Sequence, residues 1–527
     1  MPSIRRFRRP GMILAFAVSA EWPASGQKTK VRQRPAQIVR VAALASVILV
    51  ASGCRPAPLG EEARPALDLI LSGDYPDPSL VRNGPDFYMT NTCWRHQPGL
   101  LIWHSRDLTR WTPIAAALHR DVGEVWAPDL ILHGGSYYIY FPADGVIWAV
   151  RAERPEGPWS DPVCLGVKGI DPGHIATPEG RRFLFINGGY IMELAPDGLS
   201  VVGEPRKVYD GWAYPPDWVV ECFCDESPKL LYKDGYYYLT TAQGGTAGPA
   251  TSHMVVSARS RSLFGPWENS PHNPIVHTWD AGERWWSKGH GTIFEDGQGR
   301  WFIVYHAYEK GNLPLGRQVL MEPVEWTADG WFKLSRDPRV EPATRVHANA
   351  AVESDDFSGE VLKLQWRFSG THSAADYGLS RGRLRLAAVP DGWRVLQATV
   401  GDHDYEAIVR LDLEGEAQAG LFAYYDERMF AGIGIGRDGV FLYSKGRRSR
   451  EPFFAAPAKF LKIRLKEYNL SMACSEDGQV WIPCPMALEV SGYQHNVLGG
   501  FTGLKVGVAV HGGGAVLLDE FRYRALK

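Results

Sequence analysis

The sequence predicts an all-β protein made of a five-bladed β-propeller followed by a β-sandwich of the jelly-roll kind. Two observations lead to this prediction. A strand–turn–strand unit recurs five times between residues 77 and 305, and past residue 345 it gives way to two-residue alternation of apolar and polar side chains. Helical periodicity is almost absent from both regions.

Each recurring unit starts with an acidic or polar residue near Pro or Gly, runs through an apolar strand and a Gly-containing turn, and ends in an aromatic strand. The units start at Asp77, Asp129, Asp171, Glu226 and His290, so their spacings are 52, 42, 55 and 64 residues. Gly turns between β-rich flanks predict hairpins. Repeats of roughly 40–50 residues are typical of propeller blades. A sandwich is the alternative for any all-β segment, but it does not explain the fivefold recurrence.

Propeller geometry should bring the five starting residues together. The innermost strand of each blade lines the central axis, so equivalent positions on different blades converge. An Asp before Pro is often only a turn former, but four acids in register with the repeat indicate a shared site. Glycoside hydrolysis needs one acid to protonate the leaving oxygen and one carboxylate to activate water or attack carbon. A third carboxylate can raise the pKa of the acid.

Tryptophans could supply flat apolar faces for sugar rings. Six of them fall in predicted loops or at strand ends: Trp94, Trp126, Trp148, Trp212, Trp218 and Trp285. Of these, Trp94, Trp126 and Trp148 are the predicted substrate-binding residues. Core packing is the alternative role for each of them.

The region past residue 345 predicts the β-sandwich. A polar connector runs from Arg336 to Asn349, and alternation is strict in Leu461–Lys466 and similar in Tyr405–Leu413. Half-buried antiparallel strands with Gly turns favour a sandwich. The predicted domains are therefore a propeller over 69–345 and a sandwich over 350–527.

Residues 1–53 predict a signal peptide. Residues 1–40 carry nine basic side chains and one acidic one, and the uncharged stretch Val41–Gly53 follows. This stretch is too short to span about 30 Å of hydrocarbon, but it suits a signal-peptide core. The ending Ala51-Ser52-Gly53-Cys54 resembles a bacterial lipobox, which would make Cys54 a lipidated first residue before a linker over 54–68. We expect an exported protein, either a periplasmic or outer-surface lipoprotein or a simply secreted chain.

The charge balance argues against a polyanionic partner. Without residues 1–53, 48 basic and 58 acidic groups remain, a net charge of −10. Nucleic-acid binding needs a basic surface that neutralises phosphates. We therefore expect a neutral or polar partner, no nucleic acid, and contact with a membrane only through the lipid anchor.

The cysteines do not predict a disulfide framework. Six follow Cys54, and none shows the CxxC spacing typical of zinc sites. Cys222 and Cys224 would share one side of an extended strand, so we expect no bond between them. Cys474 and Cys484 are the candidate local pair.

Five motifs in order resemble those of glycoside hydrolase family 43. They are Tyr75-Pro76-Asp77-Pro78-Ser79, Trp126-Ala127-Pro128-Asp129, Gly169-Ile170-Asp171-Pro172, Glu226-Ser227-Pro228 and Gly289-His290-Gly291. The resemblance runs from about residue 70 to 340. It implies a five-bladed propeller that acts with inversion on β-xylosides, α-L-arabinofuranosides and related plant polysaccharide units.

The resemblance also implies roles for individual residues. Asp77 matches the general base of the family, Asp171 its pKa modulator and Glu226 its general acid. Glu221, followed by Cys222, resembles the acid of related invertase-type hydrolases, but Glu226 stands at a blade start and is followed by the expected hairpin. An inverting pair holds its carboxyl groups about 6.5–9.5 Å apart.

Three further residues are expected around these acids. Arg317 resembles the arginine that reaches substrate hydroxyls, and Asp129 is expected to orient sugar hydroxyls or neighbouring motif residues. His290 resembles the histidine beneath the pocket that helps hold a Ca²⁺ ion, often through water. An axial histidine without metal is the alternative.

The sandwich resembles the concanavalin-like C-terminal domain of some family 43 xylosidases, through Asp355–Gly359, Trp366 and Gly420–Tyr425. In those relatives it narrows the pocket and favours cleavage from chain ends. A separate carbohydrate-binding module is the alternative. The expected function is an exo-acting inverting hydrolase that removes xylose or arabinofuranose from oligo- or polysaccharides. A galactan-type exo-glycosidase and a non-catalytic glycan-binding lipoprotein remain the alternatives.

Overall fold

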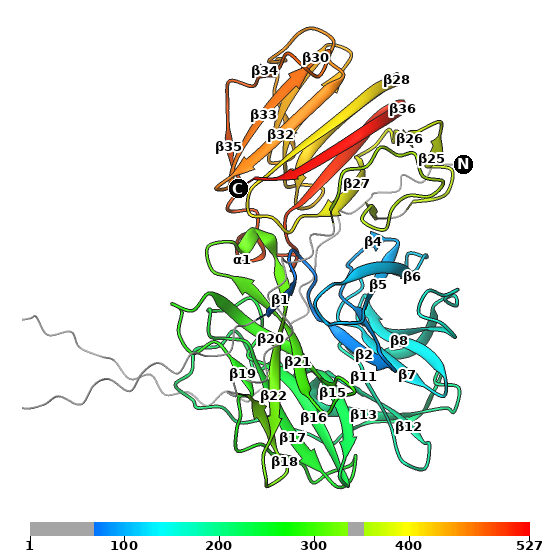
Figure 1. Cartoon of the computed structure of the whole chain (residues 1–527), viewed down its shortest axis with the longest axis vertical. Helices are drawn as coiled ribbons and strands as arrows, with labels where there is room; N and C mark the ends of the chain where they lie inside the picture. The colour runs from blue at the N-terminus through cyan, green and yellow to red at the C-terminus, as the bar shows by residue number, and fades with distance from the viewer. Residues whose placement is uncertain (1–67, 336–351, 371, 527) are drawn as a thin grey trace, which may run out of the picture. The chain divides into compact units, whose positions relative to one another are not determined.

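The computed structural model describes residues 68–335, 352–370 and 372–526, and β-strands dominate their regular structure. Residues 68–335 form five antiparallel sheets, and residues 352–526 form one larger sheet system, drawn in yellow to red in Figure 1. The predicted signal peptide, Cys54 and the connector 336–349 lie outside the described residues. No helix among the described residues is long and apolar enough to cross a membrane.

Each of the five sheets is one propeller blade, and its first strand is the innermost. The first two blades are β2 (Ser79–Asn83), β3 (Asp86–Thr90), β5 (Gly99–Ser105) and β6 (Thr112–Leu118), and then β7 (Asp129–His133), β8 (Ser136–Ala143), β9 (Val146–Ala152) and β10 (Val163–Lys168). The third blade is β11 (Gly173–Ala176), β12 (Arg182–Ile186), β13 (Tyr190–Leu194) and β14 (Val201–Lys207), with a 3₁₀ turn at Asn187–Gly189.

The last two blades follow the same order. The fourth is β15 (Glu226–Lys233), β16 (Tyr236–Gln243) and β17 (Met254–Ser260), edged by β18 (Glu268–Asn269) and β19 (Val276–His277). The fifth is β20 (Trp285–Glu295), β21 (Trp301–Glu309), β22 (Arg317–Trp326) and β23 (Phe332–Leu334), with a 3₁₀ turn at Leu313–Leu315. The five hairpin starts predicted from the repeat are therefore confirmed.

The strand β1 (Asp68–Leu71) stands first in the propeller sequence but belongs to the fifth blade. It pairs antiparallel with β22, with Asp68 opposite Met321 and Leu69 opposite Leu320. This pairing ties the first described strand to the last blade. Its first residue, Asp68, falls at the end of the predicted linker over 54–68.

The aromatic strands fill the spaces between blades. On β8, Tyr137 and Ile139 pack against the first blade, whereas Tyr138 and Tyr140 pack against the third. Five such buried apolar clusters occupy the five spaces between neighbouring blades, including the space between the fifth and the first. Because both faces of a blade are buried, its strands are apolar at successive positions.

The second domain is built around two long strands that pair along their whole length, β28 (Tyr405–Tyr424) and β36 (Lys505–Ala525). The strands beside them are β24 (Arg367–Ser369), β25 (Tyr377–Ser380), β26 (Arg383–Ala387), β27 (Arg394–Thr399), β29 (Phe430–Gly436), β30 (Gly439–Ser444), β31 (Arg447–Arg448), β32 (Phe460–Lys466), β33 (Asn469–Ser475), β34 (Ile482–Pro483) and β35 (Leu488–Glu489). A short helix, α1 (His495–Leu498), precedes β36. The predicted alternation is confirmed, because buried and more exposed side chains alternate along Leu461–Lys466.

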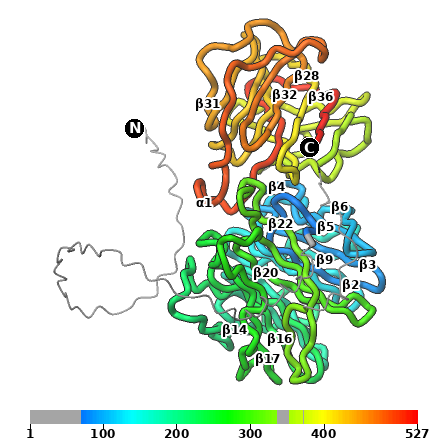
Figure 2. Tube along the Cα trace, turned by 60° about the vertical axis from the view of Figure 1, so that its left-hand side comes forward, coloured from blue at the N-terminus to red at the C-terminus, as the bar shows by residue number. Residues whose placement is uncertain are grey.

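One strand of the propeller region joins the sheet of the sandwich. β4 (His96–Gln97) lies between β3 and β5, and it pairs with β24 through Phe368 opposite Gln97 and Ser369 opposite His96. Figure 2 shows β4 at the edge of the propeller that faces the sandwich. The segment that runs on from Trp94 is thereby fixed to the second domain.

The cysteine predictions were wrong in both respects. Cys222 and Cys224 form a disulfide. Cys224 has φ 39°, so the chain turns there instead of running as an extended strand, and the Cα atoms come within 5.3 Å. Cys474 and Cys484 are free, because the register of β33 with β34 places Cys474 opposite Ile482.

Candidate active site

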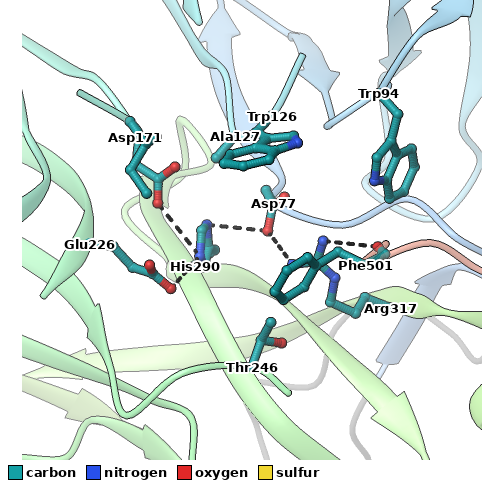
Figure 3. A pocket seen from close by; sticks show the side chains of 11 residues that line it. Asp77, Trp94, Trp126, Ala127, Asp171, Glu226, Thr246, His290, Arg317 and Phe501 are labelled. Carbon is teal, nitrogen blue, oxygen red and sulfur yellow. Dashed lines mark hydrogen bonds and ion pairs between the residues drawn. The ribbon is translucent and has the colours of Figure 1, made fainter. Parts of the chain in front are cut away.

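A pocket of about 130 Å³ opens where the inner strands begin. Its acidic groups are Asp77, Asp171 and Glu226, three of the predicted axial residues, and each comes from a different blade. The other lining residues are Trp94, Trp126, Ala127, Ile170, Thr246, His290, Arg317 and Phe501 (Figure 3). Four of the five residues that we predicted from the repeat to meet therefore line one pocket, namely Asp77, Asp171, Glu226 and His290.

The backbone bends in the same way at the head of several inner strands. Asp77, Asp171 and His290 have φ values of 58°, 53° and 54°, in the left-handed region that side-chain-bearing residues seldom adopt. Ser227, directly after Glu226, has φ 53°. Such conformations cost free energy and occur preferentially at functional sites. The shared bend turns these side chains toward the axis.

His290 stands between the three carboxylates (Figure 3). Its Nδ1 lies 3.2 Å from Oδ1 of Asp77, and its Nε2 lies 3.4 Å from Oε1 of Glu226 and 3.8 Å from Oδ2 of Asp171. Burial lowers the pKa of His290, but the three surrounding carboxylates outweigh it and raise that pKa to about 8. The ring is therefore positively charged at neutral pH.

Asp77 is held in its ionised form. Burial raises its pKa, but Arg317, His290 and His306 together bring that pKa well below its usual value. Nη1 of Arg317 donates to Oδ1 of Asp77 at 2.9 Å, and the hydroxyl of Thr92 donates to Oδ2 at 2.5 Å. An ionised, oriented carboxylate of this kind can accept a proton from water.

Asp171 has the opposite electrostatic setting. Its side chain is buried, and burial raises its pKa to about 7, with the charges of Glu226 and Asp77 adding to the rise and His290 opposing it. The backbone N–H of Ser227 donates to its Oδ2 at 3.2 Å. The pKa values of two acids in one pocket are thus pushed in opposite directions, which is a feature of acid–base sites.

Sequence reasoning missed two buried histidines behind the acids, His253 and His306. The neutral ring of His306 accepts the backbone N–H of Asp77 at Nδ1, 3.2 Å away, because burial lowers its pKa to about 3. The ring of His253 lies 5.4 Å from that of His306, and neither of its nitrogens has a hydrogen-bond partner among the described residues. A histidine interrupting the apolar run Tyr305–Ala307 was the available signal.

The surroundings of His290 do not fit a directly bound calcium ion. Calcium takes six to eight oxygen ligands, whereas the groups that converge here include the imidazoles of His253, His290 and His306. Both ring nitrogens of His290 face carboxylates of the pocket. No step of the mechanism below depends on a metal.

Two predicted substrate-binding residues lie outside the pocket lining. Asp129 is buried between blades, where it accepts hydrogen bonds from Lys229 at 2.8 Å and from the backbone of His174 at 2.7 Å. The first residue of β7 therefore links inner strands instead of facing sugar. Trp148 lies on β9, the third strand of its blade, and packs against the cluster between the first two blades. Trp148 lies within β9, opposite Phe141 on one side and Cys164 on the other, away from the strand ends that line the pocket.

The choice between the two candidate acids agrees with the geometry. Glu226 lines the pocket, whereas the exposed Glu221 does not, and Oε2 of Glu221 accepts the backbone N–H of Ala247 at 2.7 Å. Glu221 fastens one loop to another.

The sandwich contributes Phe501 to the pocket. Its carbonyl accepts a hydrogen bond from Nη2 of Arg317 at 3.4 Å, and its ring is 38% exposed. Trp94 and Trp126 line the pocket as predicted. Aromatic faces and hydrogen-bonding charges around one small cavity suit a sugar ring.

Comparison with known proteins decides the family. Residues 68–332 match the glycosyl hydrolases family 43, and residues 354–524 match the domain described as the beta xylosidase C-terminal concanavalin A-like domain. The chain belongs to glycosyl hydrolase family 43. The predicted combination of propeller and concanavalin-like sandwich is confirmed for this family 43 protein.

Three relatives illustrate the similarity. A non-reducing end alpha-L-arabinofuranosidase of Bacteroides ovatus is 31% identical over 350 residues, covering 60% of this chain and 64% of the relative. A xylan 1,3-beta-xylosidase of a Vibrio species is 32% identical over 348 residues, covering 56% and 63%. Both matches span just under two thirds of those relatives. The solved structure of the GH43 BlXynB protein from Bacillus licheniformis has a TM-score of 0.76 and 28% identity, covering 86% of this chain and 99% of the other.

Proposed function

We propose that this family 43 protein is an exo-acting glycosidase that removes terminal xylose or arabinofuranose units from oligo- or polysaccharides with inversion. The observation that carries the proposal is the placement of three carboxylates from three blades around one buried imidazole. The names of the relatives, an arabinofuranosidase and a xylosidase, indicate the sugar class.

The proposed reaction is a single displacement. Asp77, kept ionised by Arg317 and His290, removes a proton from a water molecule that attacks the anomeric carbon. Glu226 protonates the glycosidic oxygen as the bond from that oxygen to the anomeric carbon breaks. The carboxylates of Asp77 and Glu226 lie on opposite nitrogens of His290, so an imidazole ring separates them. Inversion requires about 6.5–9.5 Å between the two carboxyl groups, so that a water molecule can enter between the base and the sugar.

Asp171 and His290 act as positioning residues in this proposal. Asp171 accepts the backbone N–H of Ser227, the residue directly after the acid, so it helps to position Glu226. The charged ring of His290 contacts the base and the acid together, so it fixes the distance between them. Neither group needs to touch the atoms whose bonds change.

Phe501 and Trp94 support exo-action. They line the cavity together with Arg317, and the small volume suits a terminal unit better than the middle of a chain. Arg317 offers donors to sugar hydroxyls while it holds Asp77.

The decisive experiment is hydrolysis of nitrophenyl β-D-xyloside, α-L-arabinofuranoside and β-D-galactoside by the wild type and the Asp77→Asn variant, with the product anomer followed by NMR. We expect turnover of a pentoside, an inverted product and loss of turnover in the variant. Turnover of the galactoside alone would favour the galactan-type alternative. Failure on all three glycosides, arabinoxylan and galactan would favour a glycan-binding protein.

We also propose export of the enzyme through residues 1–53, with lipidation at Cys54. The basic start, the short apolar core and the cysteine at its end support this proposal. Labelling with radioactive palmitate should mark the wild type and not Cys54→Ser. Equal labelling of the two proteins, or labelling of neither, would contradict lipidation at Cys54 and favour simple secretion.

A further inference from the structure

An aromatic cluster lies on the loop that leads into Glu226, outside the pocket lining. We call it the aromatic strip, and its members are Trp212, Tyr214, Trp218, Phe223, His277 and Trp279. Within it, the rings of Trp218 and His277 are parallel, with centroids 4.8 Å apart. Tyr214 stacks on Trp218 at 6.5 Å and on Phe223 at 5.8 Å. The strip is thus one contiguous cluster of rings drawn from two separate segments of the chain.

The strip is exposed to an unusual degree for large apolar groups. Trp279 is 59% exposed and Phe223 is 45% exposed, and the neighbouring Val219 is 68% exposed. The ring of Trp279 stands at 87° to Trp218 and at 89° to His277, with centroids 5.9 and 4.8 Å away, so these two rings support it. Contiguous exposed apolar surface of this kind marks a binding site.

Hydrogen bonds connect the strip to the pocket. Both of its segments are fastened to residues 244–253. The carboxylate of Glu221 accepts the backbone N–H of Ala247, and Nε2 of His277 donates to the carbonyl of Thr251 at 2.8 Å. Thr246, from the same segment, lines the pocket. The disulfide between Cys222 and Cys224 closes the last turn before Glu226. The strip is therefore fastened to the segment that contributes Thr246 to the pocket, and its Phe223 lies three residues before Glu226 in the chain.

The strip precedes the acid in the chain and is fastened to the segment that lines the pocket, and this placement indicates which part of a substrate it would bind. A general acid protonates the oxygen of the leaving group, so the rest of a cleaved saccharide extends from the pocket on the side of Glu226. We propose that the aromatic strip, with Trp279 at its exposed end, binds the sugar units beyond the cleaved bond. This inference rests on the proposed function and adds to it a preference for chains over short substrates. Flat apolar rings suit the C–H faces of neutral sugars, which need no charged partner.

The test compares two substrates of one sugar. Nitrophenyl β-D-xyloside reaches only the first position beyond the cleaved bond, whereas β-1,4-xylohexaose reaches further. If the enzyme releases arabinose, nitrophenyl α-L-arabinofuranoside and α-1,5-arabinohexaose take the place of these two substrates. In Trp279→Ala we expect kcat/KM for the hexasaccharide to fall about tenfold and that for the nitrophenyl glycoside to stay within about twofold. Trp279→Phe should recover part of the loss.

Phe264→Ala is the matched control, because Phe264 is also exposed, at 42%, but packs against Phe183 and not against the strip. Both substrates should be unaffected in this variant. An equal loss on both substrates in Trp279→Ala, or no loss on either, overturns the inference. Light scattering adds a second readout, and a wild-type dimer that becomes a monomer in Trp279→Ala would assign the strip to a second copy of this chain instead. Wild-type inactivity on the nitrophenyl glycosides would contradict the proposed function itself.

Discussion

The charge state of one imidazole couples the three acids. His290 is charged below a pKa of about 8, whereas an unfolded histidine loses its charge near 6.5. Its folded-state pKa is therefore raised, so the stability that it contributes is fully present below about pH 6.5 and is lost as the pH rises through about 8. Asp77 behaves in the opposite sense, because its lowered pKa contributes stability that is lost only in strong acid.

This coupling predicts a pH-dependent effect of His290→Gln. At pH 6 the free energy of unfolding of the variant should be lower than that of the wild type, by at most about 2 kcal/mol. The variant should therefore also unfold at a lower temperature. The difference should shrink as the pH rises from 6.5 to 9, because the wild-type ring then loses its charge. Calorimetry of both proteins across this range measures it. A difference that is constant or grows with pH would show that the ring acts by packing alone.

A second prediction concerns Asp77 as the base. Asp77→Asn keeps the size of the side chain but cannot accept a proton, so kcat should fall about 10³-fold. The thermal midpoint should also fall. Thr92 and Arg317 donate to different oxygens of Asp77, and one amide oxygen cannot accept both hydrogen bonds. The buried charges of Arg317 and His290 also lose their partner. Single-turnover kinetics measure the loss of turnover, and calorimetry measures the thermal midpoint. Near-normal kcat would remove Asp77 from the mechanism.

At the residue scale, sequence reasoning succeeded wherever the repeat marks a position. Asp77, Asp171 and Glu226 precede or begin inner strands, and His290 lies within β20 at its irregular stretch, where the repeat also marks a start. His306 and His253 were not visible, because His306 lies within β21, a second strand, and His253 directly precedes β17, a third strand. The repeat has no polar marker there.

At the scale of the strand, a buried ion pair links the inner strands of the second and fourth blades. Nζ of Lys229 on β15 lies 2.8 Å from Oδ1 of Asp129 on β7, and both side chains are less than a tenth exposed. The same ammonium donates to the carbonyl of Pro128 at 2.9 Å. Breaking such a pair on one side leaves an unpaired buried charge, which is more costly than removing both charges.

Lys229→Met should therefore destabilise the protein by about 3–5 kcal/mol. The double variant Lys229→Met/Asp129→Asn should recover a large part of that loss, and its KM should match the wild type because Asp129 lies outside the pocket lining. Urea denaturation and steady-state kinetics test both statements. A raised KM in the double variant at full folding would return Asp129 to substrate binding.

The elements that the sequence did not predict are those that depend on distant partners. Hairpins such as β15–β16 could be predicted because their turn, Asp234-Gly235, has φ values of 52° and 80°, which Asp and Gly tolerate. The pairing of β1 with β22 and of β4 with β24 joins segments more than 240 residues apart. Short-range patterns carry no information about such pairs.

At the scale of the whole chain, one carboxylate connects the pocket with the sandwich. Asp74 is 1% exposed, and it accepts hydrogen bonds from the backbone N–H of Arg317 at 3.2 Å and from the hydroxyl of Thr502 at 3.0 Å. Lys505 approaches the same carboxylate at 3.3 Å and the ring of Trp94 at 5.2 Å. The resemblance predicted a sandwich that narrows the pocket. The residues responsible required the structure, because Asp74 and Lys505 lie 431 positions apart.

This connection predicts a combined loss of stability and affinity in Lys505→Met. Removing the ammonium leaves Asp74 buried without its cation, so the free energy of unfolding should fall by about 3 kcal/mol. KM should rise while kcat changes less, because Phe501 lies four residues before Lys505 on the same segment and lines the pocket. The three acids belong to the propeller instead. Lys466→Met, at an exposed position on β32, is the matched control and should change neither quantity. Urea denaturation and steady-state kinetics on a nitrophenyl pentoside decide the matter. A variant that loses stability while keeping its KM would show that the sandwich supports the propeller without shaping its pocket.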